Sequence, residues 1–291
     1  MDTIKKILNK YDISEKFDNA KKMDKENRIF ISENYVVKIF YPNKYSYYYN
    51  ELEVYKNLNN KDYLPKLYYY GEEETYKYII ISRLKGNSLF DSWNKLSNVQ
   101  KESSVRQIAK ILKDINEIRT SEVDFKMFLN KKFSSVLENL SFSGETKKNI
   151  ENIYNSKINY IKDMEKGNLI HIDVHFYNFF INSDKVFAYD FENMIMAPLD
   201  YQLLRWYRMW KYPETFIYPK NSLSSSEINS YQILMPILLE EYPSLMCNDK
   251  SDDRIKLYSL IYLLEEAKRC KLAENDVLNY IDKNKLVKIK R

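Results

Sequence analysis

Residues 169–181 read Leu-Ile-His-Ile-Asp-Val-His-Phe-Tyr-Asn-Phe-Phe-Ile and include both histidines of the 291-residue chain, His171 and His175. Asp173 lies between the histidines, and Asn178 follows it after four residues. This spacing, His-x-Asp-x-x-x-x-Asn, allows the aspartate and the asparagine to face one cleft. There a carboxylate can orient an attacking hydroxyl and an amide oxygen can bind a metal ion.

A second acidic motif follows Asn178, because residues 189–192 read Tyr-Asp-Phe-Glu. Two apolar runs joined by a polar turn at residues 182–184 separate the two motifs, which predicts a hairpin that returns Asp190 to Asn178. Carboxylate and amide oxygens are the ligands that Mg²⁺ takes in proteins. The two motifs together predict a phosphoryl-transfer centre in which Asp173 orients the acceptor hydroxyl and Asn178 and Asp190 bind magnesium.

A metal site of another kind is the alternative for the first motif. His171, Asp173 and His175 alternate along one predicted strand, so they could all face the same side and bind zinc or iron. That hypothesis gives no role to Asn178 or Asp190, and phosphoryl transfer is therefore the favoured interpretation.

Upstream of these motifs lies a candidate strand with a buried lysine. Residues 28–31 and 35–40 are β-rich runs joined by a hairpin signal at 32–34. Lys38 lies in the middle of the second run among apolar neighbours, where a charge is costly unless it is paired. We therefore predict that Lys38 contacts the phosphates of a nucleotide; the alternative is an edge-strand lysine that points to solvent.

The apolar spacing after this strand predicts a helix over residues 47–58. Glu51 on this helix is the predicted partner of Lys38, and Glu53 is the alternative. Such a pair would hold the lysine in place for phosphate binding.

Two further strands are predicted at residues 64–71 and 76–81. The residues that follow, Ser82, Arg83 and Leu84, would form the hinge between two lobes. From their place along the chain, we expect their backbone N–H and C=O groups to hydrogen-bond the adenine of ATP.

The rest of the chain carries the periodicity of amphipathic helices. Gly167 is expected to end the second of them, just before the strand that leads to the first motif. The predicted helices cover residues 100–119, 145–166, 200–210, 226–241, 252–271 and 274–282.

The order of these features resembles the aminoglycoside phosphotransferase and choline kinase branch of the protein-kinase-like fold. The resemblance covers residues 28–210 and rests on the strand lysine, the helix glutamate, Ile-Ser-Arg-Leu-Lys-Gly at 81–86, and the two motifs. Its metal motif, Asp-Phe-Glu, fits the small-molecule branch better than the protein kinases, as does Pro-Leu-Asp-Tyr at 198–201.

This resemblance implies an α+β, bilobal protein-kinase-like fold. A small antiparallel β-sheet lobe with one helix, residues 1–84, would bind the nucleotide, and a larger, mostly helical lobe, residues 85–291, would bind the acceptor. It implies ATP- and Mg²⁺-dependent transfer of the γ-phosphate to a hydroxyl of a small molecule such as an aminoglycoside, choline or a sugar. In this scheme His171 braces the catalytic loop by hydrogen bonding.

The sequence departs from the family pattern at two places. Ile172 replaces the usual glycine of the catalytic loop, and no glycine precedes Gly71, so the phosphate-covering loop expected at residues 18–27 has no glycine-rich signature. A kinase-like pseudoenzyme or nucleotide-binding scaffold therefore stays an alternative. A protein kinase is less favoured, because few residues separate Asp190 from the next helix.

Composition excludes several classes of protein. The net charge of +5 is spread along the chain, whereas nucleic-acid binders usually concentrate it on one face. The chain has no apolar run that would span a membrane and no signal region. With only Cys247 and Cys270 a disulfide framework is not expected, which predicts a cytoplasmic protein.

Two groups of residues bear on the acceptor. Aromatic rings could cage a quaternary ammonium such as choline, although a helix stripe of core residues is the stronger interpretation; they are Trp206, Tyr207, Trp210, Tyr212 and Tyr218. Glutamates on the later helices could bind an aminoglycoside, although surface helices often carry them; they are Glu240, Glu241, Glu265 and Glu266.

Overall fold

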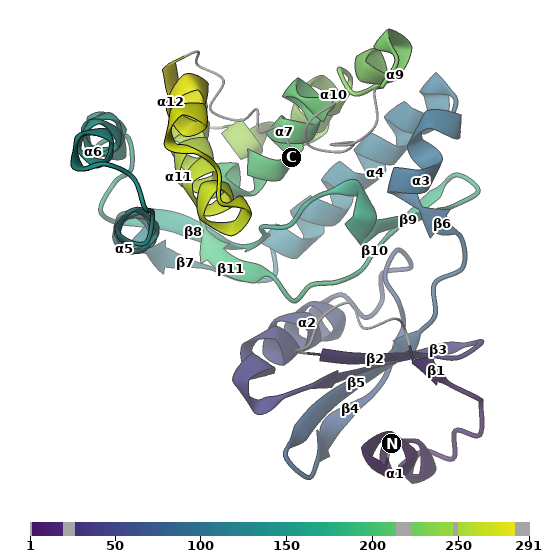
Figure 1. Ribbon diagram of the computed structural model, residues 1–291. Coiled ribbons are helices and arrows are strands. Elements are labelled where there is room, and N and C mark those ends of the chain that lie inside the picture. Colours follow the sequence, from purple (N-terminus) through teal and green to yellow (C-terminus); the bar gives the residue numbers. More distant parts are fainter. Residues whose placement is uncertain (1, 20–26, 214–222, 247–249, 283–291) are drawn as a thin grey trace. The chain divides into compact units, whose positions relative to one another are not determined.

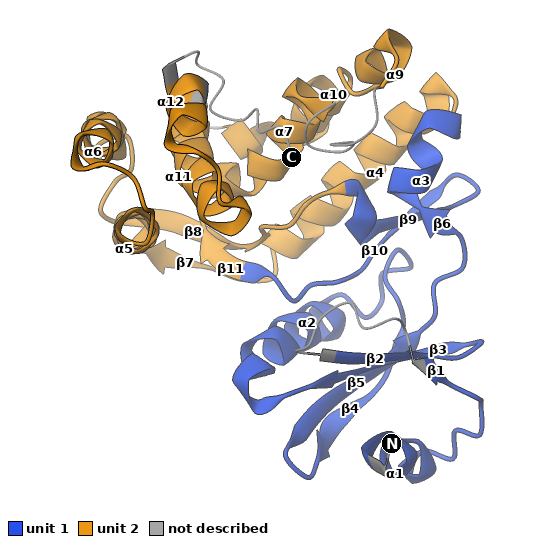
Figure 2. Cartoon of the chain, in the orientation of Figure 1, with its two compact units in different colours: residues 1–95, 176–194 blue, residues 96–175, 195–291 orange. Residues whose placement is uncertain are grey.

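The chain divides into two compact units (Figure 2). Unit 1 comprises residues 1–95 and 176–194, and unit 2 comprises residues 96–175 and 195–291. The segment that joins the two sequence motifs is thus part of unit 1. The lobe boundary between residues 84 and 85 stays a prediction.

A computed structural model describes residues 2–19, 27–213, 223–246 and 250–282. Most of the predicted phosphate-covering loop lies outside these residues, as do Tyr218, Cys247 and the segment 283–291. Within the described ranges no helix is long and apolar enough to cross a membrane.

Unit 1 contains the antiparallel sheet expected near the N-terminus. It has the four predicted strands and a fifth, β1, in the order β1-β2-β3-β5-β4 (Figure 1). Its strands are all paired antiparallel, which confirms the hairpin predicted over residues 28–40 and the two further strands predicted after it. They are β1 (Asp18–Asn19), β2 (Asn27–Ile31), β3 (Tyr35–Phe40), β4 (Leu67–Glu73) and β5 (Tyr76–Ser82).

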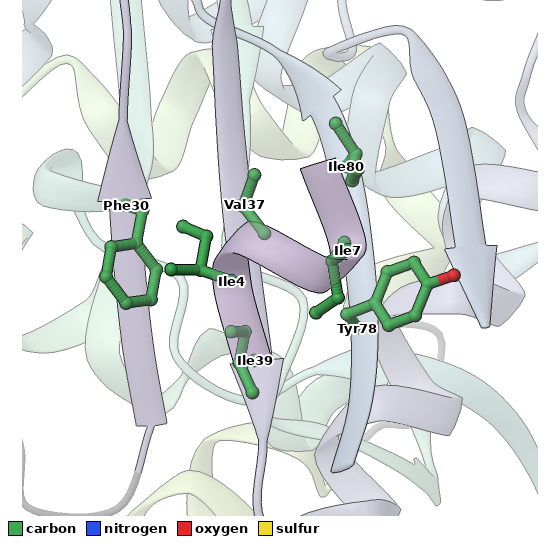
Figure 3. Close-up of a cluster of buried hydrophobic side chains, with 7 residues drawn as sticks. All are labelled: Ile4, Ile7, Phe30, Val37, Ile39, Tyr78 and Ile80. Carbon is green, nitrogen blue, oxygen red and sulfur yellow. The ribbon is translucent and has the colours of Figure 1, made fainter. Parts of the chain in front are cut away.

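One face of this sheet packs against α1 (Asp2–Lys10), a helix that the sequence analysis did not predict. Since side chains alternate along a strand, Val37 and Ile39 point to this face from β3. Figure 3 shows the resulting apolar cluster, in which α1 lies across the strands. Its buried members are Ile4, Ile7, Phe30, Val37, Ile39, Tyr78 and Ile80.

The opposite face of the sheet carries Lys38 and Phe40, and it packs against α2 (Tyr45–Asn57). Phe40 meets Tyr48 of this helix edge to face, with 5.7 Å between the ring centroids. The short 3-10 turn η1 (Pro42–Lys44) precedes α2. The helix predicted over residues 47–58 is therefore confirmed as α2, which begins two residues earlier, at Tyr45.

Lys77 on β5 attaches α2 to the sheet. Only 5% of this lysine is exposed, and its ammonium lies 4.7, 5.4 and 5.3 Å from the ring centroids of Tyr45, Tyr48 and Tyr49. It also forms an ion pair with Glu72. Cation–π contacts stabilise by about 0.5–2 kcal/mol each, depending on desolvation. These contacts therefore fix the helix that carries Glu51.

The rest of unit 1 is built around a second antiparallel sheet, of order β10-β9-β6. Its hairpin, β9 (Phe179–Asn182) and β10 (Lys185–Ala188), confirms the prediction from the sequence. The remaining elements are β6 (Asn87–Ser88), α3 (Leu89–Ser92), and the 3-10 turns η2 (Trp93–Lys95) and η3 (Phe176–Asn178).

Unit 2 is mostly helical and contains a three-stranded sheet of order β11-β8-β7, formed by β7 (Thr120–Val123), β8 (Glu165–His171) and β11 (Met194–Ala197). Most side chains of its long helix α11 are buried. The helical elements are α4 (Asn98–Asn116), α5 (Phe125–Glu138), α6 (Gly144–Ile158), η4 (Leu199–Gln202), α7 (Leu203–Lys211), α9 (Ser225–Ser230), α10 (Leu234–Glu241), η5 (Pro243–Met246), α11 (Ser251–Cys270) and α12 (Glu274–Asp282).

The helix predicted over residues 145–166 is wrong in its second half. α6 ends at Ile158, and β8 already begins at Glu165. Gly167 lies inside this strand rather than after a helix. A Cβ atom there would lie 2.8 Å from the side chain of Val123 on β7, so glycine permits the close approach of the two strands.

The helix predicted over residues 226–241 is two helices, α9 and α10, separated by a turn at residues 231–233. Pro236 lies in the first turn of α10. It has no N–H to donate to the carbonyl of Gln232, and its ring would clash with that carbonyl in a continuous helix. The chain therefore interrupts the helix before the proline.

Buried polar groups fix the strand β8 within unit 2. The Asn116 amide donates to the backbone carbonyl of Leu169 over 2.8 Å and accepts a bond from Gln202 over 2.8 Å. Asn168 donates in turn to the carbonyl of Asn116 over 3.0 Å. Bonds of this kind are costly to break in a core, since each leaves a buried group unsatisfied.

Arg254 of α11 connects the start of β8 to η4 by ion pairs. It is 2% exposed and binds Glu165 at the start of β8 through two bonds of 2.8 and 2.7 Å. Its Nε atom also lies 2.6 Å from Asp200 in η4, the acidic residue of the Pro-Leu-Asp-Tyr segment. The strand that leads to Asp173 is thus held by a buried ionic network.

Candidate functional site

Unit 1 brings Lys38 together with three carboxylates. Its ammonium hydrogen-bonds Glu51 of α2, lies 3.0 Å from Oδ1 of Asp190, and lies 3.6 Å from Oε1 of Glu192. Lys38 and Glu51 are 5% and 0% exposed. Glu51, rather than the alternative Glu53, is thus the helix residue to which Lys38 donates. Residues from β3, α2 and the second motif meet here.

The charges in this cluster do not balance. Burial acts to lower the pKa of Lys38, but the charges of Asp190, Glu51 and Glu192 outweigh it and raise the pKa well above its usual value. Lys38 is therefore a cation. Burial raises the pKa of Glu51, and Lys38 opposes this shift. Three acidic groups around one ammonium leave an excess of negative charge, which favours a further cation at this place.

The backbone places Asp190 by means of an uncommon conformation. Its φ angle is +67°, in the left-handed region, which costs a residue other than glycine about 1–3 kcal/mol and recurs at functional sites. The neighbouring Phe191 is fully buried and packs edge to face on Tyr55 of α2 at 5.6 Å. Asn50 of the same helix donates to the carbonyl of Glu192 over 2.8 Å. Helix α2 therefore holds the acidic motif.

The carboxylates of this cluster form a candidate cation site. One oxygen from each of Glu51, Asp190 and Glu192 lies within 4.8 Å of the others. These hard oxygen donors fit the preference of Mg²⁺. Asn178, the other predicted ligand, is 6% exposed. Its backbone carbonyl accepts a 3.2 Å hydrogen bond from the N–H of Tyr189, so the β9–β10 hairpin brings the second motif back to Asn178, as predicted.

Glu192 was not among the predicted site residues. Its position two residues after Asp190 is the sequence signal that could have identified it. The alternative metal site is not formed, because ligand atoms of His171, Asp173 and His175 do not converge as a group anywhere that the structure describes.

The predicted hinge has fewer donors available for adenine than expected. The N–H of Ser82 donates to the carbonyl of Lys66 over 2.9 Å, and the N–H of Arg83 donates to the carbonyl of Asn34 over 2.8 Å. An adenine contact would therefore use the N–H of Leu84 and the backbone carbonyls of the segment. This role of the segment stays a prediction.

In unit 2 Asp173 lies beyond the end of β8 among three cationic or imidazole groups. Its Oδ1 atom is 2.7 Å from Nε of Arg205 and 3.3 Å from Nε2 of His175. The buried His171 accepts a long bond, 3.4 Å, from the N–H of Asp173 to its Nδ1 atom. This contact is the kind of bracing expected of His171. Arg205, 32 residues downstream on α7, had no signal in the sequence.

These partners keep Asp173 ionised. Partial burial acts to raise its pKa, but the hydrogen bond with His175 and the charge of Arg205 outweigh it and lower the pKa from 3.8 to about 2. So acidic a group is a weak proton acceptor in the ground state, and its ionised oxygens can accept a hydrogen bond from a hydroxyl.

Removing this charge should change the dependence of stability on pH. Because the folded pKa lies below the unfolded one, the stabilisation is present above about pH 4 and is lost as the pH falls towards 2. A shift of this size corresponds to about 2 kcal/mol. We expect the free energy of unfolding of Asp173→Asn, measured in urea, to lie below that of wild type by about this amount at neutral pH, with the gap closing in acid. A gap that does not depend on pH would contradict the assignment.

The aromatic residues nominated as an ammonium cage do not form one in the part of α7 that the structure describes. Trp206 is fully buried and belongs to the core. Trp210 donates from its indole to the carbonyl of Gln232 over 3.1 Å, and its ring lies 5.2 Å from the ammonium of Lys211. Tyr207 packs edge to face on the same ring. The core interpretation of this stripe is therefore favoured.

No family model and no curated protein sequence matches the chain. Comparison with solved structures gives clear similarity of fold. Aminoglycoside phosphotransferase APH(2'')-Ib with bound ADP is 17% identical, with a TM-score of 0.66 over 98% of this chain and 96% of that chain. The ternary complex of APH(2'')-IIa with streptomycin and ATP is 15% identical, with a TM-score of 0.67 over 98% of both chains.

A more distant enzyme of the same kind gives a similar result. A thermostable mutant of APH(4)-Ia in complex with ADP and hygromycin B is 12% identical, with a TM-score of 0.62 over 92% of this chain and 91% of that chain. The chain therefore has the protein-kinase-like fold of the aminoglycoside phosphotransferases, as its motifs had predicted.

Proposed function

We propose that this protein, which has a protein-kinase-like fold, is an ATP- and Mg²⁺-dependent phosphotransferase that acts on a hydroxyl of a small molecule. The observation that carries the proposal is the buried Lys38 bound to Glu51 of α2 and to Asp190 of the acidic motif. Burying these charges costs free energy of folding, and a role of Lys38 at the phosphates of a nucleotide accounts for that cost. From its composition we place the protein in the cytoplasm, without a nucleic-acid or membrane partner.

Residues of unit 1 would bind the nucleotide. Lys38 neutralises the charge of the α- and β-phosphates, and Glu51 holds the lysine in position. Asp190 and Asn178, with Glu192, would hold Mg²⁺, which supplies charge neutralisation at the phosphates when it is bound. The backbone of Ser82, Arg83 and Leu84 is the predicted adenine contact.

Asp173 of unit 2 would act on the acceptor. Its carboxylate accepts a hydrogen bond from the acceptor hydroxyl and so directs the oxygen at the γ-phosphorus. A new phosphorus–oxygen bond forms as the bond to the β–γ bridging oxygen breaks, and ADP leaves with that electron pair. The hydroxyl proton passes to Asp173 and then to solvent. His171 braces the loop through the N–H of Asp173.

Release of ADP from Mg·ATP tests this function directly. Purified protein would be incubated with pools of amino alcohols, sugars, hydroxy acids and aminoglycosides, with Asp173→Asn as the blank. Release above the blank with any pool establishes a small-molecule kinase. If all pools are silent while ATP binding is demonstrated by calorimetry, the phosphotransferase proposal fails and a nucleotide-binding pseudoenzyme replaces it.

The role of Lys38 gives a separate prediction. Lys38→Met removes the cation proposed for the phosphates, and we expect the affinity for Mg·ATP to fall by about 10- to 100-fold, the size of a lost charge-assisted bond. The affinity for the acceptor should change less. Lys56→Met, an exposed lysine of α2, is the matched control. If Lys38→Met binds Mg·ATP as well as this control does, Lys38 has no phosphate role.

A further inference from the structure

Arg205 presents a positive charge beside the carboxylate proposed to orient the acceptor. Its Nε atom pairs with Asp173 at 2.7 Å, and its guanidinium stacks 5.3 Å from the ring centroid of Tyr262. In the described part of the chain its terminal nitrogens have the Tyr262 hydroxyl at 3.4 Å as a partner, and Asp173 is its one carboxylate. The side chain is 29% exposed, so its outer edge is accessible to a ligand.

The four glutamates that the sequence offered for binding an aminoglycoside are already engaged in ion pairs. Arg106 forms ion pairs with both Glu240 and Glu241 of α10. On α11, Glu265 lies 3.2 Å from Lys132, and Glu266 pairs with Arg269. All four glutamates that the sequence offered for binding an aminoglycoside therefore have a basic partner within unit 2.

Asp173 itself offers a cationic acceptor little attraction, because Arg205 already pairs with its carboxylate and would repel a second cation. Arg205 carries a permanent charge, and the guanidinium of the buried Arg208 lies 4.4 Å from the centroid of the same Tyr262 ring. Like charges at close range in a partly buried site repel strongly, since the effective dielectric constant there is far below that of water. Arginine, in contrast, matches the geometry of carboxylates and phosphates.

We propose that the acceptor carries an oxyanion, a carboxylate or a phosphate, which pairs with the outer edge of Arg205 while its hydroxyl faces Asp173. This inference rests on the proposed phosphotransferase function and defines its substrate class. Arg205 is then a specificity-determining residue. It selects hydroxy acids or sugar phosphates over polycationic acceptors, and the transfer step itself is the one described above.

Matched pairs of acceptors test the charge preference. The two members of each pair have the same carbon skeleton and differ at one position, where the anionic member carries a carboxylate or phosphate and the uncharged member a hydroxyl. The pairs are glycerate and glycerol, gluconate and sorbitol, and glucose 6-phosphate and glucose. Choline and kanamycin represent the cationic class. Steady-state ADP release gives kcat/KM for each compound, and the ratio within a pair measures the preference for the anion. The carboxylate and phosphate pairs distinguish the two sources of the oxyanion.

Variants of Arg205 link any preference to this residue. Arg205→Gln should lower kcat/KM for the anionic member of a pair by about 10- to 100-fold more than for its uncharged twin, mainly through KM. Arg205→Lys should restore part of the ratio, because the charge remains. Lys211→Gln, an exposed residue of the same helix, loses the same charge and should leave the ratio unchanged.

The outcomes separate this inference from the function on which it rests. Turnover of choline, kanamycin or an uncharged twin in preference to the anions overturns the inference and leaves the phosphotransferase standing. Equal losses for both members of a pair in Arg205→Gln also overturn it, since Arg205 would then only position Asp173. Silence of every compound, with ATP bound, removes the proposed function and the inference with it.

Discussion

Asp173→Asn is expected to reduce the rate of phosphoryl transfer by about 10²–10⁴-fold, the contribution of a positioned acid–base group. The asparagine keeps the shape of the side chain but loses the charge that pairs with Arg205 and His175. It can neither receive the proton nor present an acceptor oxygen in a fixed orientation. Affinity for Mg·ATP should stay within about twofold of wild type, because the groups proposed for the nucleotide belong to unit 1.

The measurement combines ADP release with calorimetric titration of Mg·ATP into each variant. Asp163→Asn is a suitable control, since this residue of unit 2 makes an exposed ion pair with Lys126. It loses the same charge outside the proposed site and should keep wild-type turnover. Near-normal transfer by Asp173→Asn would exclude Asp173 as the group that orients the acceptor.

Asp190→Asn is expected to lower the rate of Mg²⁺-dependent transfer by roughly 10²–10⁴-fold. This loss corresponds to several kcal/mol of transition-state stabilisation. A carboxylate is replaced by an amide, which is a weaker ligand for a hard cation. The effect on nucleotide affinity should change sign with the metal. In Mg²⁺ the variant should bind ATP more weakly than wild type. In EDTA it should bind ATP equally well or better, because one negative charge that repels the phosphates is gone.

Titrations of ATP with and without Mg²⁺ therefore decide whether Asp190 binds the metal. Asp184→Asn, in the turn of the β9–β10 hairpin, is the matched control and should behave as wild type in both conditions. If the affinity of Asp190→Asn for ATP does not depend on Mg²⁺ any differently from that of the control, Asp190 is not a metal ligand.

Local sequence determined the elements with regular patterns. The strand alternation of residues 35–40 predicted β3 and a lysine on one of its faces, and the polar turn after Ile181 predicted the hairpin that returns Asp190. Helices α4, α11 and α12 were predicted within a few residues because their apolar spacing is unbroken. These features depend on neighbours within a few residues, which the sequence displays directly.

Element boundaries were predicted wrongly where a residue type is compatible with two different local structures. A glycine such as Gly167 can end a helix, but here it permits the close approach of β8 to β7. That approach depends on Val123, more than 40 residues away in the chain. Proline is tolerated in the first turn of a helix but interrupts a helix interior. The single helix predicted over residues 226–241 is therefore wrong at Pro236, which lies in the first turn of a second helix. Helix α1 was not predicted. Its apolar residues Ile4 and Ile7 are buried only by packing against the sheet, which is formed by residues distant in the chain.

The protein-kinase-like fold and the candidate residues Asp173, Asn178 and Asp190 could be predicted from the chain alone, because these groups lie close together in the chain at characteristic spacings. The charges that surround these residues depend on how distant elements pack in the folded protein. Glu192 joins Glu51 and Asp190 around Lys38, and Arg205 reaches Asp173 from a helix 32 residues downstream. Electrostatic interactions depend on distance in space, and chain spacing does not encode that distance once several elements have packed together.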